Sequence, residues 1–111
     1  MARAFYRIVT APTVEELDLD DFKSAKALGA PPPRHAANLP LWDGLSVFAT
    51  EAQARAKAHD FPGHGAYIAR LEIPDDVPMR IERTIKNSRG HHTIWGGPAE
   101  LLRCVVSVVP V

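Results

Sequence analysis

The 111-residue chain contains one cysteine, Cys104, and no apolar run that approaches the roughly 18 residues of a membrane-spanning helix. A single thiol excludes an internal disulfide bond and is typical of a reducing compartment. Charged residues enter the sequence at Arg3 and Arg7, too early for a secretory signal. We therefore expect a cytoplasmic protein, or an effector domain of a longer chain, that does not bind a membrane.

The chain also lacks an excess of charge of either sign, because 13 Lys and Arg residues balance 13 Asp and Glu residues. Without a net field, nucleic acid is not expected as a partner selected by bulk charge. No histidine or cysteine pair has the spacing of a metal motif, and the adjacent His91 and His92 point to opposite faces of an extended strand. We expect no metal. The glycines match neither a phosphate-binding loop nor a dinucleotide fingerprint.

What the chain does have is apolar content of 46%, which suffices for one core, and hydrophobic patterns typical of short strands. The ranges that predict strands are 5–9, 45–49, 66–73, 79–85, 91–95 and 103–109. Helices are expected over 20–28 and 51–58, with a helical turn over 98–102, a surface loop over 30–40 and a polar loop over 86–90. The sequence thus predicts one α+β domain over 1–111, a compact and mostly antiparallel sheet of five to six strands with two main helices. The valine-rich last strand is expected at the centre of the sheet.

A strand that passes directly into a helix is the most informative local feature. Thr50 and Gln53 have the spacing of a capping box, and Glu51 and Arg55 are one turn apart on the exposed face. Ser46 lies inside the preceding strand, close to this corner. A similar pair, Thr13 and Glu16, precedes the helix expected over 20–28.

Three polar residues are candidates for chemistry, and each also has a simple structural explanation. Arg7 lies inside the first strand, where a charge needs solvent or a partner. Ser46 fills space in its strand, and Glu100 stands in a first helical turn, where it complements the helix dipole. Trp95 lies in a Gly-rich stretch of the kind that lines ligand clefts. Cys104 is expected to be buried in the last strand and inert.

Taken in order, three motifs resemble the ADP-ribosyltransferase fold: Tyr6-Arg7-Ile8-Val9, Gly44-Leu45-Ser46-Val47-Phe48 with its Ala-rich helix, and Pro98-Ala99-Glu100-Leu101. The resemblance implies a split sheet and NAD as substrate, with transfer of ADP-ribose to an acceptor or hydrolysis of NAD.

By this resemblance, Arg7 would bind a phosphate of NAD, Ser46 would position the nicotinamide ribose, and Glu100 would stabilise the oxocarbenium-like centre. Tyr67 or Trp95 would stack on the nicotinamide ring. The catalytic acid remains open, because Glu72 and Glu82 are equally placed in the sequence. The chain is also similar to small actinobacterial proteins that share the strand around Ser46 and the Gly-His-His-Thr-x-Trp-Gly stretch, which implies no function.

A second hypothesis comes from a different class. A binding module without catalysis would use a cleft around Arg7, His91, His92 and Trp95 to take a nucleotide, a peptide or a partner protein. The two hypotheses differ at Glu100, because an enzyme of the proposed kind needs this residue in the same cleft as Arg7.

Overall fold

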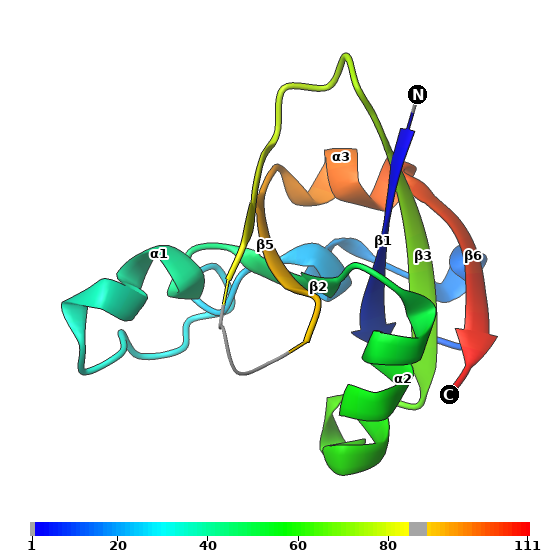
Figure 1. Ribbon diagram of the computed structural model, residues 1–111, viewed down its shortest axis with the longest axis horizontal. Helices are drawn as coiled ribbons and strands as arrows, with labels where there is room; N and C mark the ends of the chain where they lie inside the picture. Colours follow the sequence, from blue (N-terminus) through cyan, green and yellow to red (C-terminus); the bar gives the residue numbers. More distant parts are fainter. Residues whose placement is uncertain (1, 85–88) are drawn as a thin grey trace.

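The computed structural model describes residues 2–84 and 89–111, which form a six-stranded antiparallel sheet in the order β4-β5-β2-β1-β3-β6 (Figure 1). The strands are β1 (Ala2–Val9), β2 (Leu45–Phe48), β3 (Tyr67–Pro74), β4 (Arg80–Arg83), β5 (His91–Trp95) and β6 (Val105–Pro110). With two main helices, the architecture is α+β and confirms the predicted fold class.

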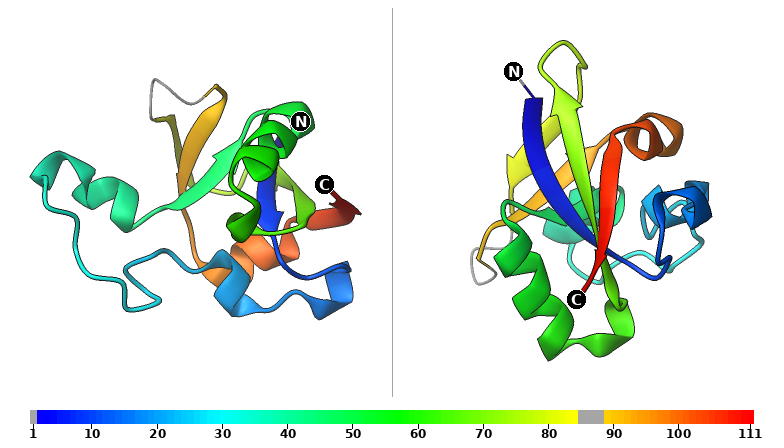
Figure 2. Two further views of the ribbon diagram at one scale, coloured as in Figure 1. Left: turned by 90° about the horizontal axis from the view of Figure 1, so that it is seen from below. Right: turned by 90° about the vertical axis from the view of Figure 1, so that its right-hand side faces the viewer.

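The two main helices are α2 (Glu51–Asp60) and α3 (Pro98–Arg103), and they cover opposite faces of the sheet (Figure 2, right). The remaining helical segments are α1 (Leu39–Trp42) and the 3-10 turns η1 (Val14–Glu16), η2 (Leu19–Phe22), η3 (Ala36–Asn38) and η4 (Pro62–His64). The capping box of α2 is confirmed, because Thr50 Oγ1 accepts from Gln53 N at 3.2 Å and Gln53 Oε1 accepts from Thr50 N at 3.1 Å. The Glu51–Arg55 ion pair is present at 2.9 Å.

Each face of the sheet has its own apolar cluster. The larger cluster lies on the face of α3 and η2, where Leu101 and Phe22 pack against odd-numbered residues of the strands, such as Phe5 and Leu71. The smaller one lies under α2 and contains Phe48, Ala54 and Ile68. Strand alternation therefore assigns even-numbered residues of β1 and β2 to the α2 face.

The sheet is nearly divided into two halves. β1 and β3 pair over eight register positions, whereas β1 and β2 pair only at Tyr6 and Phe48. Beyond this position the strands separate, so Ile8 and Ser46, which would face each other in a continuous ladder, are not paired. The half-sheets β4-β5-β2 and β1-β3-β6 thus meet at one end and leave a gap at the other.

Three sequence predictions on individual elements are wrong. The helix expected over 20–28 is replaced by the 3-10 turn η2 and a separate turn over 25–29, because Lys23 already returns to extended backbone and Lys26 N donates to Trp42 O at 3.1 Å. β6 lies at the edge of the sheet and not at its centre, and Val106 is 51% exposed there. Cys104 caps α3 outside the strand and is half-buried, and burial raises the pKa of its thiol.

The other predictions agree in part. The strand expected over 79–85 contains β4, and the loop expected over 30–40 is mainly exposed but includes η3 and the start of α1. Residues 85–88, which include most of the predicted polar loop, lie outside the described residues. Within the described residues, no helix has the length and apolar character needed to cross a membrane.

Candidate functional site

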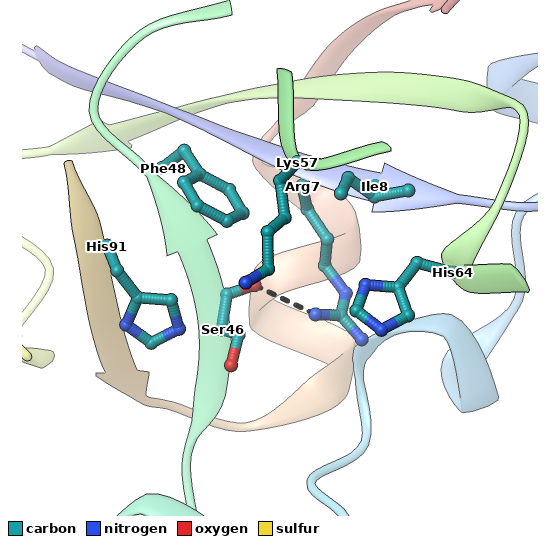
Figure 3. A pocket seen from close by; sticks show the side chains of 7 residues that line it. All are labelled: Arg7, Ile8, Ser46, Phe48, Lys57, His64 and His91. Carbon is teal, nitrogen blue, oxygen red and sulfur yellow. Dashed lines mark hydrogen bonds between the residues drawn. The ribbon is translucent and has the colours of Figure 1, made fainter. Parts of the chain in front are cut away.

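The gap between the half-sheets opens into a cavity of about 480 Å³. Its described lining consists of Arg7, Ile8, Ser46, Phe48, Lys57, His64 and His91, and Figure 3 shows these side chains gathering from β1, β2, β5, α2 and η4. Four of the seven residues are basic, and none of these described lining residues is Asp or Glu. A cavity of this size is in the range of small-molecule sites.

Arg7 occupies the place where the ladder between β1 and β2 is missing. Its Nη1 donates to Ser46 O at 2.8 Å, so the guanidinium takes a carbonyl that a neighbouring strand would otherwise use. Its Nε donates to Asp21 O, also at 2.8 Å. Burial lowers the pKa of Arg7 to about 10, and the negative charge of Asp21 acts in the opposite direction. Both hydrogen bonds go to neutral carbonyls, and no carboxylate among the described residues pairs directly with this cation.

His91 stands across the cavity on β5, opposite Phe48 in register and 5.6 Å from its ring in an edge-to-face contact. Its Nδ1 lies 2.8 Å from Thr84 Oγ1, which in turn lies 2.7 Å from the buried Thr93 Oγ1. This hydroxyl chain fixes the ring. Burial lowers the pKa of His91, a hydrogen bond from the ring to the Thr84 backbone opposes the shift, and the charges of Lys57 and His92 lower it further.

Two further basic residues, Lys57 and His64, stand at the mouth of the cavity. Lys57 lies beside the buried Ala54 and Ala58 of α2, at the boundary where the helix meets the sheet. His64 ends η4 and is exposed. Neither residue was singled out from the sequence. The available signals were the position of Lys57 next to the helix's buried alanines and the place of His64 in a Pro-Gly-His-Gly turn.

The structure brings together Arg7, Ser46 and His91, but Glu100 does not line this cavity. Glu100 lies exposed in the first turn of α3, on the opposite face from α2, with its carboxylate close to Gly97. The sequence placed Arg7 and Glu100 in one cleft only through the resemblance, and the packing of α3 against η2 separates them.

The other residues assigned to the cleft also lie elsewhere. Tyr67 packs against the larger apolar cluster, and the ring of His92 lies 5.2 Å from Phe5 on that same face. His92 and His91 alternate along β5, as the sequence analysis expected of neighbours on a strand. Trp95 Nε1 donates to Pro40 O at 2.8 Å, and the guanidinium of Arg80 covers its ring at 4.3 Å. Trp95 therefore ties the α1 region to β5.

Glu82 is the acidic candidate nearest to the cavity by register. It pairs with Thr93, which pairs with Ser46, so the three share one row and one face of the sheet. Two strand spacings place the backbones of Glu82 and Ser46 about 10 Å apart. Glu82 forms an ion pair with Arg80 at 2.9 Å, and Glu72 forms one with Arg70 at 3.1 Å.

No group of three or more His, Cys, Asp or Glu side chains among residues 2–84 and 89–111 is arranged to hold a metal ion. Comparisons of the chain with protein-family models, with curated proteins and with solved structures find no match. The chemistry of the site therefore has to be argued from its own residues. They form a basic cavity with two apolar walls and one hydroxyl.

Proposed function

We propose that the cavity between β1 and β2 binds a small phosphate-bearing ligand of the nucleotide class. The observation that carries the proposal is Arg7, a half-buried guanidinium bonded only to backbone carbonyls and facing a cavity with three further basic residues. A guanidinium with a lysine nearby and no carboxylate is stabilised by an anion, and guanidinium matches the geometry of phosphate.

A nucleotide suits the remaining walls. Phe48 and Ile8 offer an apolar surface to a base or ribose, and the Ser46 hydroxyl offers one hydrogen bond. NAD is the first ligand to test, because the order of motifs around Arg7 and Ser46 resembles NAD-using enzymes. We place this binding in the cytoplasm, where nucleotides are abundant and a lone thiol stays reduced.

The test is calorimetric titration of the purified protein with NAD, ADP and inorganic phosphate at low salt. Lys57→Gln is the informative variant, because Lys57 lines the cavity from α2 without belonging to a core cluster. Arg55→Gln is its matched control: it removes one positive charge from the same helix, but Arg55 pairs with Glu51 and does not line the cavity.

We expect Lys57→Gln to weaken binding of ADP by about tenfold, the effect of losing one charge-assisted contact, and Arg55→Gln to leave it within about twofold. Equal losses in the two variants would mean that the ligand responds to overall charge rather than to the cavity. Absence of heat with all three ligands at millimolar concentration would refute the proposal.

The second candidate is turnover of NAD, by ADP-ribosyl transfer or by hydrolysis. The hydrogen bond from Arg7 to Ser46 O supports it, because it joins two of the three motifs across a divided sheet. Glu100 does not line the cavity, which argues against it as the catalytic acid. Glu82 is the alternative, because it lies in register with Thr93 and Ser46 on the neighbouring strands.

Nicotinamide release followed during the same NAD titration decides between binding and turnover. If Glu100 carries the chemistry, Glu100→Gln abolishes release and retains NAD binding; if Glu82 carries it, Glu82→Gln does so. Binding without release in the unmodified protein would favour the non-catalytic module.

A further inference from the structure

Phe61 is a large aromatic side chain with no place in either apolar cluster, and 49% of it is exposed. It follows the last residue of α2 and precedes η4, so it lies at the junction that carries both basic residues of the cavity mouth. An exposed phenylalanine at such a junction contributes little to the core, and its contacts must be sought elsewhere.

Those contacts are with Lys57 and His64, the two basic residues at the cavity mouth. The Lys57 ammonium lies 4.5 Å from the centroid of the Phe61 ring, within the range of a cation–π interaction. The His64 ring is stacked on Phe61 at 5.5 Å between centroids and 15° between planes. Phe61 thus contacts two of the four basic residues that line the cavity while not lining it itself.

The backbone holds this arrangement against the end of β1. Phe61 N donates to Lys57 O at 2.9 Å and His64 N donates to Phe61 O at 3.0 Å, so the ring and both basic residues belong to one compact turn. Gly65 follows with φ +147°, and a side chain there would collide with the backbone of Val9. The turn therefore approaches β1 closely, two residues from Arg7.

We infer that Phe61 is a positioning residue of the anion site, which holds Lys57 and His64 at the cavity mouth so that both reach an anion bound to Arg7. The inference rests on the proposed function. A long lysine side chain loses much rotamer freedom when it is fixed for binding, and a ring that holds it beforehand reduces that loss.

The test uses ADP as the probe and compares Phe61→Leu with Phe61→Tyr. Leucine keeps apolar bulk and lacks a π face, whereas tyrosine keeps the ring. We expect Phe61→Leu to weaken ADP affinity by about fivefold, the size of an exposed cation–π contact, and Phe61→Tyr to restore it. Thermal unfolding of both variants should match the parent, because Phe61 is half exposed.

A second measurement separates positioning from general structural damage. In the Lys57→Gln, His64→Gln background, Phe61→Leu should have no further effect on ADP affinity, because the ring then has neither side chain to hold. The NMR ring-current shift of the His64 protons should be lost in Phe61→Leu and retained in Phe61→Tyr.

Equal ADP affinity of the parent and Phe61→Leu would overturn the inference while leaving the proposed function intact. The same holds for a loss in Phe61→Leu that persists without Lys57 and His64. Failure of the unmodified protein to bind ADP would overturn both, and it is visible before any Phe61 variant is compared.

Discussion

The surroundings of His91 lower the pKa of its ring, and this has consequences for stability. Burial is the main reason that its pKa lies below 6.5, and Lys57 and His92 add to the effect. The groups that face it are Lys57 from α2, Phe48 from β2, Thr84 after β4 and its strand neighbours His92 and Thr93, with Arg7 and His64 across the cavity. None of these described groups is acidic, and the hydrogen bond with Thr84, which favours the charged ring, is outweighed by burial.

The first prediction is a loss of stability in weak acid. The pKa of His91 is lower in the folded state than in the unfolded state, so the unfolded chain takes up the proton more readily. The contribution of neutral His91 to the free energy of unfolding is therefore fully present above pH 6.5 and decreases as the pH drops through the unfolded-state pKa. The slope is at most about 1.4 kcal/mol per pH unit. Urea unfolding at pH 7.5 and 5.5 measures it.

His91→Gln should reduce this loss, whereas His59→Gln, at an exposed position of α2, should leave it unchanged. Equal pH dependence in the parent and His91→Gln would show that another group is responsible. A bound phosphate would favour the protonated ring, so the affinity for ADP should rise between pH 7.5 and 5.5 in the parent and less in His91→Gln.

At the scale of elements, α2 depends on its first turn. Its interior is rich in alanine and buries only Ala54 and Ala58, so the capping box of Thr50 and Gln53 is a large part of what fixes its start. Thr50→Ala should lower the free energy of unfolding by about 1 kcal/mol, whereas Thr50→Ser should retain most of it. Chemical denaturation measures both, and an equal loss in the two variants would mean that the methyl group, not the hydroxyl, is responsible.

The elements that the sequence predicted are those determined locally. Thr50 and Gln53 signal a helix start by themselves, and the alternation from Tyr67 to Ile73 requires only a sheet with one better-buried face. The helix over 20–28 failed because contacts distant in sequence compete with it: Trp42 O accepts from Lys26 N, and Trp42 Nε1 donates to Ala30 O at 3.1 Å.

The order of the strands in the sheet could not be predicted from the sequence, because it too depends on contacts between distant residues. Valine on both faces of the last strand predicts burial on both faces, yet it does not identify which strands are neighbours. β6 pairs only with β3 within the described residues, and at this edge Val105, Val108 and Val109 are half-buried and Val106 is exposed. The residues of the site were likewise predictable only in part. Arg7 and Ser46 were recognisable in the sequence as polar residues within strands. Lys57 and His64 were not, because only the packing of α2 and η4 brings them to the cavity.

At the scale of the whole molecule, the division of the sheet suggests unequal stability of its halves. β1 and β3 pair over eight positions, and β3 contributes Ile68, Ala69, Leu71 and Ile73 to the buried interior. β5 pairs with β2 and with β4 over four positions each. One register position and the hydrogen bond from Arg7 to Ser46 O connect the halves at the cavity.

Hydrogen exchange should therefore show two levels of protection. Amides of β1 and β3 should exchange only by global unfolding, and those of β4 and β5 should exchange faster by local opening of their half-sheet. Uniform protection across the described strands would show that Tyr6–Phe48 and Arg7 suffice to join the halves into one cooperative unit.

A ligand in the cavity should reduce the difference in amide protection between the two half-sheets. Such a ligand would contact both halves, because Arg7 belongs to one half and Ser46 and His91 belong to the other. At a free concentration of about 100 times its Kd, ADP makes any opening that destroys the site about 100-fold rarer. Amides of β2 and β5 should gain protection by that factor in the parent and by less in Lys57→Gln at the same ADP concentration. If ADP binds but leaves the amide exchange rates of β2 and β5 unchanged, the ligand contacts one half-sheet only. The gap between the half-sheets is then not its binding site.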